Sequence, residues 1–324
     1  MEVRLTAHKG KRCSNVTSFS GRLLSMAMED LDSSVVLHEG GRYPQAVFSL
    51  QQAVEKASKS LARALKIIEN NEMRKIKHKT PKIFKKSIHE FLESVVLIHA
   101  EASLTPETEV LLKSAGMDLE KIAASKDKIS THVEKIFELV SDYDQSKELI
   151  TGVITNLKLN LGNLEKNRAD FEKNGFDETQ MNTIRQHVNI TVRNLVKKGS
   201  RTEVEKASSL LCEEKLLKNT IQLTFKYAEC SIALFYLALL TAPHAEKARY
   251  PDPNQRFDPL DYYTPDRPIV AALPELHIYT RIALERLDNL YDHIETIAND
   301  NKGGLTVPNY DPHVTHLTHM ESNP

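Results

Sequence analysis

Arg286 and His293 lie seven residues apart in the segment RLDNLYDH, and their side chains can act together on a phosphodiester. In an α-helix seven residues make about two turns, so both side chains lie on one face, about 10 Å apart along the axis. A guanidinium binds and neutralises a phosphate, and an imidazole transfers a proton near neutral pH. The pair therefore predicts metal-free RNA cleavage by the neighbouring 2′-hydroxyl group. The alternative is two ordinary surface residues of an amphipathic helix.

The densest positive charge lies in residues 73–89, which contain seven lysines or arginines and no acidic residue. They are Arg74, Lys75, Lys77, Lys79, Lys82, Lys85 and Lys86. Such a cluster can contact a nucleic-acid backbone, with each contact adding salt-dependent affinity. A solvated helix face and turn is the alternative. Phe84 is the one aromatic residue in this basic segment, so no base-stacking platform is predicted.

Histidines mark two further segments. In HAEKARYPD, residues 244–252, three side chains either form a polar site at the mouth of a helical bundle or hold a long loop in place by hydrogen bonds. They are His244, Glu246 and Arg249. Near the carboxyl end, three imidazoles at i, i+3 and i+6 can bind a transition metal if that stretch is ordered, or take up metal adventitiously. They are His313, His316 and His319.

Walker A, dinucleotide-binding, HExxH and GxSxG patterns do not occur, which excludes the common nucleotide, zinc-protease and hydrolase classes.

The composition predicts that helices position these residues. The chain has 324 residues, of which 40% are hydrophobic and only 11 are glycine, with no tryptophan, so we expect an all-α protein with a sizeable core. The net charge of −1 gives no general attraction to nucleic acid. Cys13, Cys212 and Cys230 are odd in number and far apart, which indicates reduced thiols in a cytoplasmic protein without a structural metal.

Periodicity and breaker residues place the helices. They are expected at about residues 18–40, 44–68, 81–102, 118–143, 146–174, 177–198, 202–242 and 274–299. The longest of these is unusual for a globular protein, so we expect a break near Glu213 or Lys218. Its apolar run, residues 231–242, is about half the length of a membrane span and is interpreted as a buried core helix. Six prolines between residues 243 and 268 predict a long loop instead of a regular helix.

The helix AVFSLQQAVEKASKSLARAL, residues 46–65, resembles the signature helix of the HEPN family (higher eukaryotes and prokaryotes nucleotide-binding). That Ala-rich helix bears a QQA-x-EK-x-x-K pattern, here Gln51, Gln52, Ala53, Glu55, Lys56 and Lys59. The segment TPKIFKKSIHEFLESV resembles the next helix of the family, with His89 before its apolar run. Residues 239–252 also resemble prokaryotic HEPN-like proteins.

The resemblance implies a bundle of four or five helices that commonly dimerises, and in many members a metal-independent RNase with an R-x(4-6)-H motif. Arg286 and His293 fit the longest form of that motif, although Leu287 follows the arginine where many members have Asn, Asp or His. Glu55, Lys59 and Gln52 would form a supporting polar face. Members without the motif serve as binding modules, so a non-catalytic adaptor for RNA, a nucleotide or a protein partner is the alternative. A homodimer without a cofactor and without a membrane association is expected.

This interpretation divides the chain into five parts. Residues 1–18 are a flexible basic lead-in and 301–324 a flexible tail. Residues 19–102 and 216–300 are the two parts of one HEPN-like bundle, and residues 103–215 are a helical insertion or second helical module between them.

Overall fold

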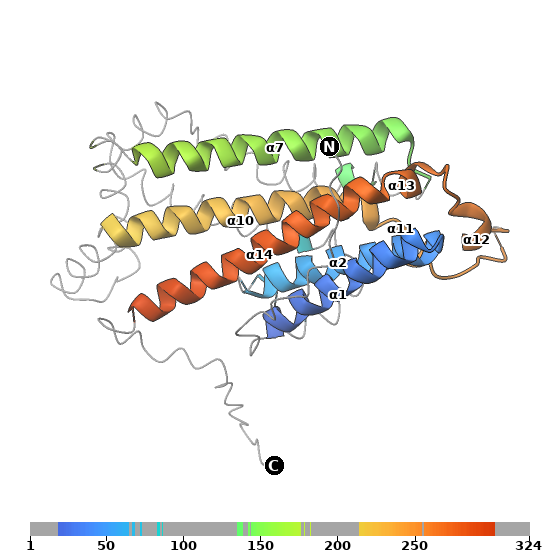
Figure 1. Cartoon of the computed structure of the whole chain (residues 1–324), viewed down its shortest axis with the longest axis horizontal. Helices are drawn as coiled ribbons and strands as arrows, with labels where there is room; N and C mark the ends of the chain where they lie inside the picture. Colours follow the sequence, from blue (N-terminus) through green and yellow to red (C-terminus); the bar gives the residue numbers. More distant parts are fainter. Residues whose placement is uncertain are drawn as a thin grey trace, which may run out of the picture.

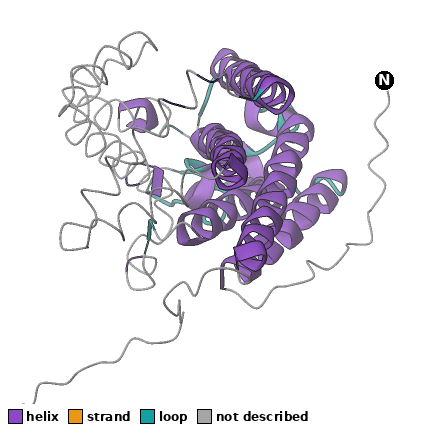
Figure 2. Cartoon of the chain, turned by 90° about the vertical axis from the view of Figure 1, so that its left-hand side faces the viewer, coloured by secondary structure: helices purple, strands orange, loops and turns teal. Residues whose placement is uncertain are grey.

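The computed structural model describes four long segments, residues 19–64, 144–175, 214–254 and 256–301. It also describes residues 67–68, 72, 83–84, 86, 135–138, 142, 178 and 182. Within these residues every named element is an α-helix, and an isolated β-bridge joins Asp252 to Phe257. The expected all-α class is confirmed, with long helices packed side by side in Figure 1 and seen nearly end on in Figure 2.

The first two helices, α1 (Phe19–Glu39) and α2 (Tyr43–Ala64), form an antiparallel hairpin. Both begin where the sequence predicts, but α2 ends earlier than expected, since residues 67 and 68 are not helical. The turn between them contains Gly41, whose φ of 70° lies in the left-handed region that glycine adopts without strain. Pro44 lies in the first turn of α2, where its missing N–H group leaves no hydrogen bond unmade. The two breaker residues therefore end one helix and start the next.

Helix α2 lies inside the bundle, in contact with α1, α10, α14 and the short helices that precede α14. Its apolar stripe is buried as expected: Val47, Leu50, Val54, Ala57 and Leu61. Gln51 and Glu55, which belong to its polar side, are buried as well. The helix is therefore enclosed on more sides than its apolar stripe alone predicts.

Helix α7 (Lys147–Asn174) has the bounds that the sequence predicts. The Ser146 side chain caps its first turn by accepting a hydrogen bond from the Leu149 amide at 3.2 Å. Gly175 ends it at a φ of 62°, and its amide donates to the Phe171 carbonyl at 2.8 Å. The inner face of α7 joins the same hydrophobic cluster as α1 and α2, through Ile150, Val153, Ile154, Leu157 and Leu161. The predicted insertion thus contributes directly to the common core.

Helices α10 (Glu214–Thr241) and α14 (Leu273–Asn301) complete the bundle. Helix α10 is continuous through Lys218, while Glu213, the other expected break point, lies outside the described residues. The apolar run of α10 is buried at Ala233, Leu234 and Leu237, as expected of a core helix. In the described part of the chain one stretch, Ile221–Thr241, has the length and apolarity to cross a membrane, and core helices commonly meet the same criteria.

The proline-rich segment between α10 and α14 contains single helical turns. They are α11 (His244–Lys247), α12 (Pro259–Tyr262) and α13 (Pro268–Ala271). Pro259 and Pro268 each lie in the first turn of such a helix, where proline is tolerated. The segment thus has no long helix, as predicted, but is more regular than a plain loop.

Several predictions fall on residues outside the described part. These are the lead-in, the tail with its three histidines, His89, Cys13, Cys212 and all of the basic segment except Ile83, Phe84 and Lys86. Of the helices expected at 118–143 and 177–198, the described residues 135–138, 178 and 182 are helical, whereas residue 142 is not. The boundaries of the five parts stay a prediction.

Candidate functional site

Arg286 and His293 both lie on α14 and turn toward α10. Arg286 Nη1 lies 3.7 Å from Oε2 of Glu229, and His293 Nε2 lies 3.5 Å from the carbonyl oxygen of Asn219. Both partners belong to α10, in which the residue numbers fall as those of α14 rise, so the two helices run antiparallel. The spacing of seven residues therefore places both side chains along one helix–helix seam.

The Arg286 side chain is held by two carboxylates from two helices. Its Nη2 is ion-paired with Glu165 of α7, in addition to the contact with Glu229. The side chain is only 19% exposed, and its Nη1 atom is buried without a hydrogen-bond partner among the described residues. Arg286 is therefore a partly buried ion-pair residue and differs from the exposed surface arginine of the alternative interpretation.

Glu229 connects Arg286 to a second arginine. Its side chain is 5% exposed, and its Oε1 accepts a hydrogen bond from Nε of Arg168 on α7 at 2.8 Å. Arg168 also reaches Glu172, one turn further along α7, at 3.3 Å. Pairing with Glu229 raises the pKa of the Arg168 guanidinium, which stays charged. We call Glu165, Arg168, Glu172, Glu229 and Arg286 the ionic cluster.

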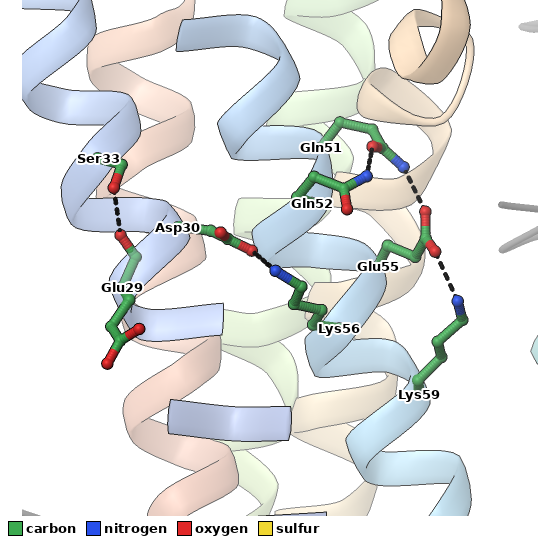
Figure 3. A network of polar contacts seen from close by, with 8 residues as sticks. All are labelled: Glu29, Asp30, Ser33, Gln51, Gln52, Glu55, Lys56 and Lys59. Carbon is green, nitrogen blue, oxygen red and sulfur yellow. Dashed lines mark hydrogen bonds and ion pairs between the residues drawn. The ribbon is translucent and has the colours of Figure 1, made fainter. Parts of the chain in front are cut away.

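The supporting residues predicted on α2 form a separate chain of hydrogen bonds (Figure 3). Gln52 Nε2 donates to Gln51 Oε1 at 2.6 Å, and Gln51 Nε2 donates to Glu55 Oε2 at 2.8 Å. Lys59 Nζ donates to Glu55 Oε1 at 2.6 Å. In the same view Lys56 points the other way, to Asp30 of α1.

The polar contacts of Gln52 and Lys59 in the described chain thus stay within α2, whereas those of Arg286 lead to α7 and α10. The proposed orienting role of Glu55 and Lys59 toward Arg286 and His293 remains a prediction. Glu55 is a buried carboxylate, and Lys59 and Gln51 of the same helix compensate its burial by donating hydrogen bonds to it.

Lys86 is the described member of the basic segment. Its Nζ contacts both carboxylate oxygens of Glu72, at 2.7 and 2.9 Å. The Glu72 charge offsets that of Lys86, so this lysine adds less to a positive patch than its sequence neighbourhood indicates. The other six residues of the segment lie outside the described chain.

His244 is fully buried in the segment that follows α10. Its Nδ1 is 2.9 Å from the Tyr263 hydroxyl, and the two rings meet edge to face. Burial lowers the pKa of His244 to about 3, so the imidazole is neutral at physiological pH. The Arg249 guanidinium lies 4.8 Å from the ring centres of Phe48 and Tyr250. Both contacts favour the interpretation in which these residues hold the loop in place.

A second buried imidazole, His277, is absent from the sequence predictions. Ser34 Oγ donates to the Ala46 carbonyl at 2.7 Å, so its only proton is used there. The 2.8 Å contact with His277 Nε2 therefore requires a proton on that nitrogen. Burial lowers the pKa of His277 to about 4. This hydrogen bond connects α14 to the α1–α2 hairpin.

The acidic members of the ionic cluster are also absent from the sequence predictions. Two features of the sequence mark these residues once the structure is known. Glu229 is an acidic residue inside the apolar helix α10, and Glu165, Arg168 and Glu172 repeat at the spacing of one helix face. In the described residues no group of three or more His, Cys, Asp or Glu side chains is placed to hold a metal ion.

The fold is an all-α bundle in which the ionic cluster joins α7, α10 and α14. Residues 20–85 match the family model of the HEPN domain, which supports the resemblance of this segment to the HEPN family. The match begins in α1 and includes α2, and it indicates a function related to nucleotides or RNA. No curated protein and no solved structure gives a significant match to the chain. Arg286 and His293 lie outside the matched residues.

Proposed function

We propose that the protein binds RNA and cleaves it without a metal ion, with Arg286 and His293 as the catalytic pair. The observation that supports this proposal is their common orientation toward α10 in a bundle whose first hairpin matches the HEPN family model. Arg286 would hold the phosphate and neutralise its charge. His293 would transfer the proton, a contribution of about 10²- to 10⁴-fold to the rate.

The reaction is an internal transesterification. The 2′-oxygen attacks the adjacent phosphorus and loses its proton, the bond from phosphorus to the 5′-oxygen breaks, and that oxygen takes up a proton. The products are a 2′,3′-cyclic phosphate and a 5′-hydroxyl, and no oxidant or cofactor is consumed. A homodimer would place two such sites about a two-fold axis.

A non-catalytic RNA- or nucleotide-binding module is the second candidate. The observation that favours it is the double pairing of Arg286 with Glu165 and Glu229, which leaves its charge neutralised in this conformation. An arginine in this state stabilises the bundle whether or not it meets a phosphate. The two candidate functions differ in the role of His293, which transfers a proton in the catalytic one and has no chemical role in the other.

The test is incubation of the purified protein with mixed RNA in EDTA, with product ends identified by mass. Cleavage to cyclic-phosphate ends is expected, with loss of about 10²-fold or more in His293→Ala and Arg286→Ala. Arg281→Ala is the matched control, since Arg281 is an exposed arginine of the same helix that pairs with Asp32. Cleavage that survives His293→Ala contradicts the catalytic assignment. Binding without cleavage supports the second candidate.

A further inference from the structure

The ionic cluster repeats one arrangement twice. Arg168 and Arg286 come from different helices and both face the single buried carboxylate of Glu229, at 2.8 and 3.7 Å. Each arginine also pairs with one glutamate of α7, Arg168 with Glu172 and Arg286 with Glu165. The two arginines thus share an inner partner and have separate outer partners.

The inner and outer partners differ in exposure. Glu229 is 5% exposed, whereas Glu172 is 43% and Glu165 is 48% exposed. Removing one partner of a buried pair is costly, because the other charge stays buried and uncompensated. An exposed pair contributes about 0 to 1 kcal/mol and is readily exchanged for another anion. Glu229 therefore fixes the arginines, and the outer glutamates occupy positions that a ligand can take.

We propose that Arg168 and Arg286 form a two-arginine clamp for RNA phosphates, in which Glu165 and Glu172 stand in for the phosphate oxygens. The proposal rests on the proposed function and adds Arg168 of α7 as a second phosphate-binding residue. An arginine binds a phosphate through two parallel hydrogen bonds, a stronger contact than a solvated surface ion pair. RNA can therefore displace the outer glutamates.

The charges and donors fit this exchange. With both outer glutamates in place, three carboxylates outnumber two guanidinium groups, and the cluster repels a phosphate. With the outer glutamates turned away, the arginines outnumber the one remaining carboxylate. Nη2 of Arg286, which now pairs with the exposed Glu165, is the donor that this exchange frees for a ligand oxygen, while Nη1 faces Glu229.

The clamp predicts that removing an outer glutamate strengthens RNA binding. The experiment measures binding of a fluorescent, fully 2′-O-methylated oligoribonucleotide by the full-length protein at low salt, because the methyl groups prevent cleavage. Glu165→Gln is expected to lower the Kd about two- to fivefold, the range of an exposed ion pair. Arg168→Ala is expected to raise the Kd about tenfold.

A second ion pair between α7 and α14 supplies matched controls. Lys158 pairs with Glu275 at 2.5 Å, and both side chains are about as exposed as Glu165. Glu275→Gln removes the same charge as Glu165→Gln, and Lys158→Ala removes the same charge as Arg168→Ala. Arg168→Lys, compared by melting temperature, separates lost binding from lost folding, since it keeps the charge and loses the guanidinium fork.

Three results overturn the clamp. The first is a Kd for Glu165→Gln equal to that of wild type or of Glu275→Gln, and the second is an equal Kd for Arg168→Ala and Lys158→Ala. In both cases RNA binding by wild type leaves the proposed function intact. The third is absence of RNA binding and cleavage by wild type itself, which removes the proposed function and the clamp together.

Discussion

Replacing His244 by phenylalanine should remove a large part of the acid sensitivity of this protein. The imidazole is fully buried, and burial lowers its pKa from an ordinary value of 6.5 to about 3. In the unfolded chain the same group binds a proton near pH 6.5. Between these two values the unfolded state holds the extra proton, so the free energy of unfolding falls as the pH falls from 6.5 to 3.

The size of the effect follows from the two pKa values. One unit of pKa difference corresponds to about 1.4 kcal/mol, so lowering the pH from 7 to 5 should cost about 2 kcal/mol through His244 alone. His277, with a pKa of about 4, adds a similar loss over the same interval. His244→Phe should therefore remove about half of the loss that the two buried imidazoles cause, and the phenyl ring fills nearly the same space.

The assay is urea unfolding of wild type and His244→Phe at pH 7, 6 and 5. Tyr263→Phe is the control, because it removes the hydroxyl that bonds His244 but leaves the imidazole in place. It should lower the free energy of unfolding by about 1–3 kcal/mol at every pH and keep the wild-type pH dependence. An unchanged pH dependence in His244→Phe would refute the assignment of His244 as a buried neutral imidazole.

Three further predictions concern packing, reactivity and anchoring. Leu157→Ala on the inner face of α7 should lower the free energy of unfolding by about 2–5 kcal/mol. Leu159 is 59% exposed, so Leu159→Ala should lower it by less than about 0.5 kcal/mol. Urea unfolding of both variants at pH 7 measures the difference. Burial raises the pKa of the Cys230 thiol to about 12. In a variant whose other two cysteines are replaced by serine, iodoacetamide at pH 8 should therefore label Cys230 only in denaturant. Rapid labelling of the folded protein would contradict the buried position. Tyr291→Phe should cost about 1 kcal/mol, because it removes a 2.7 Å hydrogen bond to Ser60, and thermal melts that match wild type would show that this bond contributes nothing.

The sequence predicts well those features that depend on neighbouring residues. The start of α7 at Ser146 and its end before Gly175 follow from capping chemistry, which is written in a few consecutive positions. The turn at Gly41 and the apolar stripe of α2 are local in the same sense. These features need no knowledge of which helix packs against which.

Other features depend on which helices meet, and single-sequence patterns do not contain that information. Glu55 is charged and lies on the polar side of α2, so periodicity assigns it to solvent, yet it is buried because other helices cover that side of α2. The ionic cluster joins Glu165 to Arg286 and Arg168 to Glu229, partners that are 121 and 61 residues apart. The spacing of Arg286 and His293 was visible in the sequence, but the carboxylates that control Arg286 were not.

The matched HEPN segment and the candidate catalytic pair lie at opposite ends of the chain, and Tyr291 connects them. It stands between Arg286 and His293 in sequence, and its hydroxyl meets Ser60 Oγ of α2 at 2.7 Å. Ser60 donates its own proton to the Ser20 carbonyl of α1 at 2.6 Å, so Tyr291 must be the donor to Ser60. This relay anchors one side of α14 to the α1–α2 hairpin, while Arg286 and His293 reach α10 from another side. The α1–α2 hairpin therefore fixes the rotation of α14 about its axis, and with it the direction in which the two side chains point.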